Sequence, residues 1–327
     1  MTYTGPVVYL NGVAYGIAER VSTNVKAFAQ DTGRWSQTGP PMAQLPSKMR
    51  KLIGVDPGWP QVGSDLSNAE LRIAAELSQD QMFLDAFKLG WDLHTLSTCE
   101  LFGYDYPPNR EKSAIHTGPD CAEWRAKYAW EGEDDARRKF GKIFQFRTLY
   151  GGQPRTAYTI PGAAKLGLSR SELEQAGYRW LASHPKLNAF WEHHGTEAAD
   201  RFVVHNIFGR RRVLCGQDPM SRWREGINHP IQSFVSDLVN TIVLETYAAC
   251  NAMTYNEKGV WSTHPGVSQV RLCGQMHDSL LWAFPQARFD ELKAMALEVA
   301  QRPRTFGDFT FQFPVSSYEK YPYERTV

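Results

Sequence analysis

The sequence is poor in cysteine and has neither a long apolar run nor a secretion signal. Its 327 residues include five cysteines, which are scattered and form no C-x-x-C pair. This usage is typical of a reducing compartment and argues against a zinc site. No apolar run is long enough to span a membrane, and the N-terminus lacks the basic start and apolar core of a signal peptide. We therefore expect a cytoplasmic protein.

The chain also lacks an excess of charge of either sign. Lys and Arg number 36 and Asp and Glu 35, so the net charge of +1 does not by itself indicate a nucleic-acid partner. A hydrophobic content of 42% is ordinary for a globular protein, and the length allows two or three subdomains. One cluster of arginines is a candidate phosphate-binding surface, although an exposed basic loop is the simpler interpretation. It contains Arg210, Arg211, Arg212, Arg222 and Arg224.

Strands are predicted near both ends of the chain. In three segments, residues of high strand propensity flank a short turn, which is the pattern of a β-hairpin. They are residues 7–18 around Asn11-Gly12, residues 202–214 around Phe208-Gly209, and residues 270–285 around His277-Asp278. Residues 36–48 are rich in turn formers and predict an extended, irregular stretch.

Helical periodicity dominates the part of the chain between these strands. Residues 62–78 begin like the end of a strand and become helical by about Glu70, while residues 104–120 are rich in Pro, Asn and Gly and predict an irregular insertion. Further helices are predicted over most of 134–192, over 230–250 and over 286–301. Strands at both ends with helices between them predict an α+β domain that carries a helical insertion.

One predicted helix, RRKFGKIFQFRTLYGG at residues 137–152, carries two cations and two aromatics on one side. They are four residues apart, and each step drifts only about 40° around a helix of ~3.6 residues per turn. The four are Arg138, Lys142, Phe146 and Tyr150. The apolar packing face is expected from Phe140, Ile143 and Phe144. Gly151 and Gly152 are expected to end the helix in a left-handed cap.

The composition of this stripe allows two interpretations. A charged stripe is usually a solvated face and aromatics at helical spacing are usually core, but few solvated faces hold Phe and Tyr, and few core faces hold Arg and Lys unless these are paired. A ligand with an anionic end and a flat end, such as a nucleoside triphosphate, would match both kinds of side chain. Spacing alone leaves the two interpretations open.

Two acidic residues, Asp65 and Asp278, stand at the ends of predicted strands, and each alone is typical of a turn or a cap. They belong, however, to a series of motifs by which the sequence resembles the family A DNA polymerases, the DNA polymerase I type, from about residue 32 to its end. The stronger motifs are DLSNAELR at 65–72, the R-x-x-x-K-x-x-x-F-x-x-x-Y-G helix at 138–151, and QMHD at 275–278. The weaker ones are TGRWS at 32–36, DLH at 92–94, FGRRR at 208–212 and NHPIQ at 228–232.

The resemblance implies the polymerase right-hand fold, with an antiparallel palm sheet and a helical fingers insertion. The palm is expected at residues 1–90 and 206–327, and the fingers at residues 91–205. Because only 31 residues precede TGRWS, the thumb is expected to be absent or minimal, with no exonuclease domain and no proofreading. A separate thumb or processivity subunit then becomes a candidate partner.

The resemblance also implies a template-directed DNA polymerase that adds deoxynucleotides from dNTPs to the primer of primer–template DNA, in a bacterial or phage-infected cytoplasm. Two divalent ions about 3.5–4 Å apart activate the attacking oxygen and neutralise the leaving one in such transfers. By resemblance, Asp65 and Asp278 would bind these ions, with the backbone carbonyl of Leu66 as a further ligand. Hard oxygen ligands and substrate phosphates favour Mg²⁺, with Mn²⁺ as a substitute.

The nucleotide-binding residues are assigned through the same resemblance. Arg138 and Lys142 would bind the triphosphate and stabilise charge on the leaving group, and His94 would add a hydrogen-bond donor. Phe146 would pack on the sugar and base, and Tyr150 would lie where the templating base arrives.

A steric gate and the DNA contacts complete the assignment. Glu70 would occupy the space that a 2′-hydroxyl needs, which rejects ribonucleotides. Gln232 and His277 would contact the minor groove at the primer end, where every base pair presents acceptors. The resemblance also implies three residues that would lie near the primer or template backbone: Arg34, Arg224 and Asn228.

The sequence departs from the family at several positions. Ser279 follows the HD pair where most members have Glu, and HDS also occurs in single-subunit phage RNA polymerases, so an RNA-polymerase-like nucleotidyltransferase stays an alternative beside a phage-like DNA polymerase. Glu70 and Phe146 argue against it, because the RNA polymerases lack that gate. Arg147 replaces a usual Gly, and Gln44 lies where the family has a different template contact. A non-catalytic primer–template binding subunit of a split polymerase is the other alternative, which the presence of both metal-binding acids disfavours.

Overall fold

The computed structural model describes residues 7–10, 13–16, 24–27, 29–38, 56, 58–251, 254–255, 261–262 and 269–320. The chain divides into two compact units. Unit 1 comprises residues 1–65, 242–300 and 315–327, and unit 2 comprises residues 66–241 and 301–314. Helices and antiparallel strands are both present, so the predicted α+β class is confirmed. Gln44 and the predicted turn Asn11-Gly12 lie outside the described residues.

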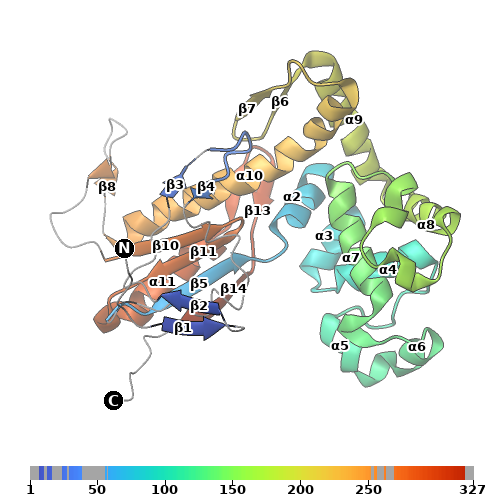
Figure 1. The fold of residues 1–327 in the computed structure, drawn as a ribbon, viewed down its shortest axis with the longest axis horizontal. Helices are drawn as coiled ribbons and strands as arrows, with labels where there is room; N and C mark the ends of the chain where they lie inside the picture. The colour runs from blue at the N-terminus through green and yellow to red at the C-terminus, as the bar shows by residue number, and fades with distance from the viewer. Residues whose placement is uncertain are drawn as a thin grey trace. The chain divides into compact units, whose positions relative to one another are not determined.

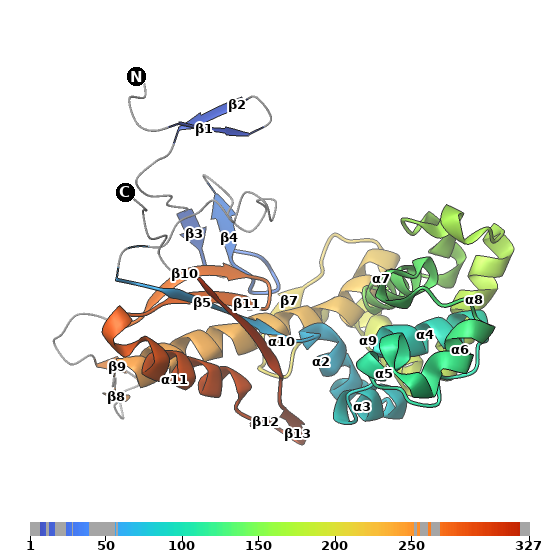
Figure 2. The ribbon, with the colours of Figure 1, turned by 90° about the horizontal axis from the view of Figure 1, so that it is seen from below.

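The main sheet of unit 1 has four strands in the order β10-β11-β5-β14; all four are labelled in Figure 1, and Figure 2 views the sheet from another side. They are β5 (Gln61–Leu66), β10 (Arg271–Met276), β11 (Ser279–Ala283) and β14 (Val315–Lys320). Strands β10 and β11 form the hairpin predicted around His277-Asp278, and β11 also pairs antiparallel with β5. The hairpin prediction is therefore confirmed, and the pairing brings an early and a late motif of the sequence into one sheet.

Helices from unit 1 pack against this sheet. They are α11 (Phe289–Gln301), preceded by the 3-10 turn η6 (Gln286–Arg288), and the last turns of α10 (Pro219–Cys250). The ring of Tyr247 on α10 lies 5.9 Å from the ring of Trp282 on β11, and the tyrosine hydroxyl accepts a hydrogen bond from the backbone N–H of Leu272 at 3.1 Å. Because Trp282 is almost fully buried, this contact contributes strongly to the stability of the layer.

Short antiparallel pairs make up the remaining strands among the described residues. They are β1 (Val7–Leu10) with β2 (Val13–Gly16), β3 (Asn24–Lys26) with β4 (Ser36–Thr38), β6 (Val203–His205) with β7 (Arg211–Val213), β8 (Thr254–Tyr255) with β9 (Trp261–Ser262), and β12 (Arg304–Phe306) with β13 (Phe309–Phe311). Leu10 pairs with Val13, and His205 pairs with Arg211. The predicted hairpin at 202–214 is therefore confirmed, and so is the strand pairing predicted for 7–18, whose turn lies outside the described residues.

Unit 2 is mostly helical (Figure 1). Its helices are α2 (Ala69–Ser78), α3 (Gln81–Lys88), α4 (Leu93–Phe102), α5 (Lys112–Thr117), α6 (Ala122–Lys127), α7 (Ala136–Leu149), α8 (Arg170–Ser183), α9 (Pro185–Arg201) and most of α10, with 3-10 turns η2 (Pro119–Cys121), η3 (Gly132–Asp134), η4 (Pro154–Thr159) and η5 (Ala163–Leu166). Trp180 on α8 is fully buried, 5.6 Å from Phe144 on α7 and 6.1 Å from Phe83 on α3. In the described part of the chain, no helix is both long and apolar enough to cross a membrane.

Helix α10 begins at Pro219 rather than at the predicted Pro230, so Pro230 lies inside the helix. Proline favours the first turn of a helix because it lacks the N–H that a helix interior requires, and this preference made Pro230 resemble a helix start. The additional turns pack closely on α9: a Cβ atom at Gly226 would lie 2.4 Å from the carbonyl oxygen of His194. This packing against α9 stabilises the turns before Pro230.

Residues 104–131, here called the aromatic segment, are more regular than predicted. The prediction of an irregular insertion over 104–120 is wrong in part, because α5 and η2 form there. The segment packs through its rings, which bury a large apolar area at little cost in side-chain entropy. The buried members of this core are Cys99, Ile115, Trp124 and Trp130, and the partly buried ones are Tyr104, Tyr106 and Tyr128.

A buried histidine ties the helices of unit 2 together. His184, between α8 and α9, is fully buried, with Nδ1 3.2 Å from Oδ1 of Asp80 and Nε2 3.0 Å from Oε2 of Glu100. Burial by itself would lower the pKa of His184, but the hydrogen bonds and charges of the two carboxylates outweigh it and raise the pKa to about 9. Both ring nitrogens therefore carry protons at neutral pH and donate to Asp80, the N-cap residue of α3, and to Glu100 on α4.

We expect the free energy of unfolding to fall as the pH rises from about 6.5 to 9. The pKa of His184 is about 9 in the folded chain and about 6.5 in the unfolded one. The folded state therefore holds the additional proton, and its contribution of about 3 kcal/mol is complete below pH 6.5 and lost as the pH passes 9. Urea unfolding at one-unit steps of pH measures this for the unmutated chain and for His184→Gln.

The control for this measurement is His205→Gln, which changes an exposed histidine on β6. It should keep the pH slope of the unmutated chain, whereas His184→Gln should flatten it. The same slope in both variants would show that His184 does not hold the proton.

Candidate functional site

The two predicted metal-binding acids lie on neighbouring strands of the unit 1 sheet. Asp65 is the cross-strand partner of Ser279, the first residue of β11. Asp278 directly precedes Ser279, in the two-residue turn between β10 and β11. The register therefore brings the backbone of both acids to the same end of the sheet.

The turn that carries Asp278 has a left-handed backbone at its first central residue. His277 has φ 55°, an uncommon value for a residue other than glycine. A positive φ at this position matches the right-handed twist of the flanking strands. The side-chain amide of Gln275 donates to the carbonyl oxygen of His277 at 2.7 Å, and Gln37 donates to the carbonyl oxygen of Gln275 at 2.9 Å. These hydrogen bonds fix the turn and with it the position of Asp278.

Asp65 is a partly desolvated carboxylate. Burial raises the pKa of Asp65 above its ordinary value, and among the described residues no hydrogen bond or ion pair offsets this effect. Leu66 follows Asp65 and ends β5, with its side chain buried. Carboxylate and carbonyl oxygens are the protein ligands that Mg²⁺ prefers, and a bound cation would compensate the desolvated charge. The residues present at this end of the sheet therefore fit a divalent ion.

Helix α7 in unit 2 carries the mixed stripe. The helix ends at Leu149, and Tyr150 is its C-terminal cap residue rather than a helical residue. Gly151 has φ 75°, which confirms the predicted left-handed end. Arg138, Lys142 and Phe146 therefore follow one another at helical spacing, and Tyr150 lies just beyond them.

The packing face of α7 differs from the predicted one. Phe140 and Phe144 are buried as predicted, but Ile143 is 37% exposed, so its prediction as a core residue is wrong. The buried residues of α7 recur every three or four positions and form a face that does not include Ile143. They include Gly141, Phe144, Gln145 and Thr148.

Arg138 is a buried, paired cation, which is the condition under which an arginine occurs on a core face. Nε donates to Oδ2 of Asp92 at 3.0 Å, and Nη2 donates to Oδ1 of Asp92 at 2.9 Å. Arg138 is 8% exposed. Among the described residues no hydrogen bond reaches Nη1, so its two N–H groups remain available to a ligand.

Asp92 is charged although it is buried. Burial would raise the pKa of Asp92, but the hydrogen bonds and charge of Arg138, with the hydrogen bond of Thr95, outweigh it and lower the pKa to about 2. Thr95 Oγ1 donates to Oδ2 of Asp92 at 2.7 Å. A bidentate pair of this kind fixes the plane of the guanidinium as well as its position.

His94 is buried beside this pair. Burial lowers the pKa of His94 to about 4, although a hydrogen bond with Gln145 acts in the opposite direction. Nδ1 lies 2.6 Å from Oε1 of Gln145, an acceptor, so the neutral ring carries its proton on Nδ1. Nε2 therefore donates to a phosphate, as the resemblance implies, only when the ring takes up a second proton. The ring of Phe146 lies 6.1 Å from the ring of His94.

The remaining predicted nucleotide-binding residues differ in how they are held. Lys142 is exposed, and the structure records no ion pair for it among the described residues. The hydroxyl of Tyr150 donates to Oε2 of Glu70 on α2. This bond fixes the carboxylate of Glu70 directly beside the end of α7.

The predicted DNA contacts belong to both units. Asn228 and Gln232 lie one turn apart on α10, and within the described chain no partner reaches the buried Oδ1 of Asn228. Arg224, one turn earlier, is exposed. Arg34, between β3 and β4, and the exposed His277 belong to unit 1.

Most arginines of the cluster at 210–224 form ion pairs or hydrogen bonds with other residues of the chain. Arg210 pairs with Asp237 at 2.5 Å, and Arg212 pairs with Glu225 at 2.5 Å. Arg222 donates to the carbonyl oxygen of Ala199 at 2.9 Å. Exposed arginines of the cluster are Arg211 and Arg224. The cluster is therefore a weaker phosphate-binding surface than its composition indicates.

Arg147 joins the end of α7 to η4. Its Nη1 donates to the carbonyl oxygen of Thr156 at 3.0 Å and to Oγ1 of Thr159 at 2.6 Å. Its side chain and backbone also line the position that a Cβ atom of Gly152 would occupy, at 2.5 Å and 2.7 Å. This departure from the family pattern therefore has a physical role, because it fastens the turn after Tyr150 to the next element.

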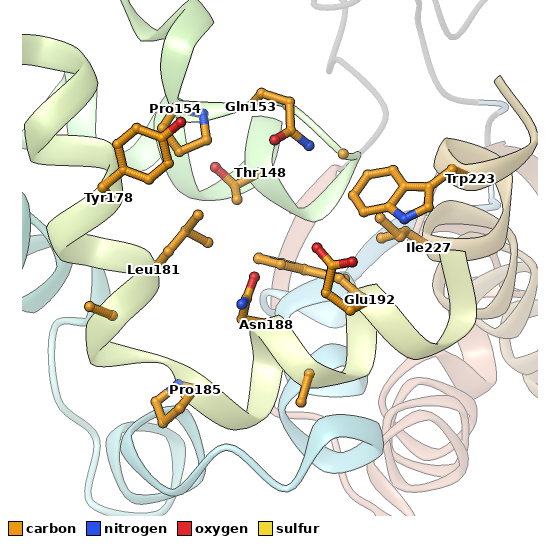
Figure 3. A pocket seen from close by; sticks show the side chains of 15 residues that line it. Thr148, Gln153, Pro154, Tyr178, Leu181, Pro185, Asn188, Glu192, Trp223 and Ile227 are labelled. Carbon is orange, nitrogen blue, oxygen red and sulfur yellow. The ribbon is translucent and has the colours of Figure 1, made fainter. Parts of the chain in front are cut away.

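A cavity of about 470 Å³ lies behind that turn, within unit 2 (Figure 3). Gln153 and Pro154 line it on one side, Tyr178 of α8 on another, and Glu192 of α9 on a third. None of the side chains predicted to bind nucleotide is among the described residues that line it. The cavity is therefore separate from the predicted nucleotide site.

Two residues that hold predicted site residues in place, Asp92 and Gln145, were not predicted from the sequence. Asp92 holds Arg138 and Gln145 holds His94. Asp92 stands in the DLH motif, two residues before His94, and Gln145 is a single polar residue between Phe144 and Phe146. A polar residue at a core position of an amphipathic helix requires a partner, and this signal was present in the sequence.

Comparisons with known proteins agree on one family. The profile of DNA polymerase family A matches residues 7–315. A thermostable DNA polymerase I of Thermus thermophilus is 26% identical over 313 residues, which are 92% of this chain and 32% of that protein. DNA polymerase I of Chloroflexus aurantiacus is 26% identical over 288 residues, 85% of this chain and 26% of that protein. The chain thus spans no more than about a third of the length of these curated relatives.

A solved structure shares the fold. It is the POL domain of Pol1 from M. smegmatis in complex with DNA primer-template and dNTP, with a TM-score of 0.70 and 20% identity. The match covers 93% of this chain and 48% of that chain. This likeness confirms the predicted polymerase fold.

Proposed function

This chain belongs to DNA polymerase family A, and from that premise we propose that it acts as a DNA-directed DNA polymerase, adding deoxynucleotides to the 3′ end of a primer. The observation that supports the proposal most directly is the partly desolvated carboxylate of Asp65, one position away in the sheet register from the turn that carries Asp278. The named relatives are DNA polymerases, and the solved neighbour is a complex with primer-template and dNTP. We assign residues 1–90 and 206–327 to the palm and residues 91–205 to the fingers.

In this proposal Asp65, Asp278 and the carbonyl of Leu66 hold two Mg²⁺ ions, for which Mn²⁺ can substitute. When bound, such ions lower the pKa of the attacking hydroxyl and neutralise charge on the leaving pyrophosphate. The chain contributes the geometry: the β5–β11 register and the hydrogen-bonded turn at His277 hold the two acids before any ligand arrives. Carboxylates held in advance lose little entropy on binding.

The stripe of α7 would bind the nucleotide. Lys142 and the available Nη1 of Arg138 would contact the triphosphate, whose charge would also favour protonation of His94 and so let Nε2 donate. Phe146 would pack on the sugar and base, and Tyr150 would occupy the place of the templating base until the template arrives. The mixed composition of the stripe is explained if one ligand has an anionic end and a flat end.

Glu70 would exclude the 2′-hydroxyl of a ribonucleotide. Tyr150 donates a hydrogen bond to the carboxylate of Glu70. This bond restrains the Glu70 side chain, so the side chain cannot easily rotate away from a 2′-hydroxyl. A restrained side chain discriminates between sugars better than a mobile one, because rotation of the side chain cannot relieve a steric clash with the 2′-hydroxyl.

We expect Glu70→Ala to increase the use of ribonucleotides relative to deoxynucleotides by roughly tenfold or more, the range in which one steric contact discriminates between substrates. Primer extension with each sugar in separate reactions measures the ratio. Glu76→Ala, which shortens a partly exposed glutamate on the same helix, is the matched control and should keep the unmutated ratio. Equal use of both sugars by the unmutated chain would favour the RNA-polymerase-like alternative.

Primer–template DNA would be contacted by the side chains that the resemblance assigns to this role. Arg34 and Arg224 would contact phosphates, which adds a salt-dependent contribution to affinity. Asn228, Gln232 and His277 would contact the primer end, and the acceptors of the minor groove let such contacts test shape without reading sequence. The buried Oδ1 of Asn228, which has no partner in the described chain, fits a role in which DNA supplies the donor.

The proposed activity does not include proofreading. We expect a primer with a mismatched 3′ end to be extended slowly rather than shortened.

Primer extension by the purified chain tests the proposed function. Radiolabelled primer on a longer template should lengthen only when Mg²⁺ or Mn²⁺ and dNTPs are all present. Absence of extension under every metal condition, together with intact primer–template binding, would favour the non-catalytic alternative.

A further inference from the structure

The aromatic segment reaches the predicted triphosphate site through Asp92. Oδ2 of Asp92 lies 3.0 Å from Nε of Arg138 and 3.0 Å from Nε2 of His116, which belongs to α5 of the aromatic segment. The backbone N–H of Asp92 donates to the carbonyl oxygen of Arg110 in the same segment at 2.8 Å. Asp92 is 5% exposed. A single buried carboxylate therefore joins the segment to the stripe of α7.

The tautomer of His116 is set by its neighbours. Nε1–H of Trp130 points to Nδ1 of His116 at 3.4 Å, and the two rings are stacked at an angle of 12°. Because Nδ1 accepts, the proton of the neutral ring lies on Nε2 and is donated to Asp92. His116 therefore acts here as a hydrogen-bond donor of fixed direction, and its side chain is 8% exposed.

The aromatic segment also holds the residue next to Arg138. Arg137 donates to the carbonyl oxygens of Tyr128 and Ala129 at 2.8 Å and 2.9 Å. Its guanidinium lies 5.4 Å from the centre of the Trp130 ring. Two successive arginines at the start of α7 are thus held, one directly and one through Asp92, by the same segment.

We propose that the aromatic segment positions Arg138 for the triphosphate, with Asp92 and His116 as positioning residues; the inference rests on the proposed function. Asp92 takes the Nε and Nη2 side of the guanidinium, which directs the Nη1 side to a ligand. His116 restrains the carboxylate, so the arginine loses less freedom when phosphate binds. Neither Asp92 nor His116 needs to touch the nucleotide. The segment therefore sets nucleotide affinity from outside the site.

The test uses a pair of substitutions at one position in the full-length chain. His116→Phe keeps a ring against Trp130 but removes the donor, and we expect it to raise the KM for dNTP about fivefold, as for the loss of one hydrogen bond. His116→Gln places an amide N–H near the former Nε2 and should restore most of the affinity. Asp92→Asn should raise KM by about thirtyfold, because a bond to a charged group is weakened.

Two readouts separate positioning from general damage. The maximal rate and the primer–template affinity should change less than about twofold in His116→Phe, because no group that touches DNA is removed. Lys127→Ala, which removes an exposed ion pair with Asp105 in the same segment, should leave the KM unchanged. An unchanged KM in both His116→Phe and Asp92→Asn, or equal losses in His116→Phe and His116→Gln, would overturn the proposal.

Binding of tripolyphosphate, followed by isothermal titration calorimetry without metal or DNA, separates this inference from the proposed function. If the unmutated chain binds tripolyphosphate and His116→Phe binds it about fivefold more weakly, the inference stands even where no primer is extended. If the chain extends primers but His116→Phe changes neither the tripolyphosphate affinity nor the KM for dNTP, the proposed function stands and the inference fails. A chain that neither extends primers nor binds tripolyphosphate overturns both.

Discussion

Asp65→Ala and Asp278→Ala are each expected to lower primer extension by more than about 10³-fold, because in the proposed mechanism each removes a ligand of the ions that stabilise the transition state. The two acids lie on adjacent strands at one end of the unit 1 sheet. Asp65 is partly desolvated without a compensating partner in the described chain. Single-turnover extension at saturating dNTP and Mg²⁺ measures the loss. Primer–template affinity should not weaken, since neither change removes a positive charge.

The matched control is Asp290→Ala, which removes an exposed acid of the same unit, on α11, where it pairs with Lys293 at 3.0 Å. It should extend primers at the unmutated rate. Extension within about tenfold of the unmutated rate by either Asp65→Ala or Asp278→Ala would contradict the assignment of two metals to this turn. Loss of DNA binding in either variant would instead indicate that the hairpin had lost its structure.

The parts of the fold that the sequence predicts are those set by local signals. The hairpin at His277-Asp278 follows from two alternating runs separated by two residues, and the confirmed β10–β11 pair places Asp278 in the turn. The end of α7 follows from Gly151, whose positive φ suits a residue without a side chain. In both cases a few neighbouring residues determine the backbone, so no tertiary information is required.

The parts that the sequence does not predict depend on residues far apart in the chain. Arg138 has the spacing of a surface stripe, and only its partner Asp92, 46 positions earlier, explains why it is buried. Ile143 is apolar at a plausible helical position, yet the packing partners of α7 select a different line of residues. The turns of α10 before Pro230 need Gly226 against α9. Periodicity describes one helix and cannot identify the surface that the helix meets.

The structure explains one departure from the family pattern, the arginine at position 147. At a position where the resemblance implies Gly, the arginine fastens the end of α7 to Thr156 and Thr159. Together with the hydrogen bond between Tyr150 and Glu70, this contact restrains the turn on both sides. Movement of α7 during nucleotide binding would therefore require the turn and η4 to move as one piece.

Lys142→Ala is expected to lower the maximal extension rate by about 10²–10³-fold, the loss typical when one charged group that stabilises a transition state is removed. On the stripe of α7, Arg138 is already neutralised by Asp92, whereas Lys142 is exposed and has no recorded ion pair among the described residues. In the proposed mechanism this charge of Lys142 is available to the leaving pyrophosphate, where negative charge develops. Single-turnover extension across dNTP concentrations separates the rate from the nucleotide affinity.

Lys139→Ala is the matched control for this prediction, because Lys139 is also exposed on α7 and pairs with Asp134 at 2.7 Å. It removes the same charge from the same helix one turn earlier, so a general effect of net charge would appear in both variants. Lys142→Arg, which keeps a cation of different shape, should retain more of the rate than Lys142→Ala. If Lys142→Ala and Lys139→Ala both extend primers within about threefold of the unmutated rate, the stripe does not face the triphosphate, and the two cations and two aromatics of α7 need another explanation.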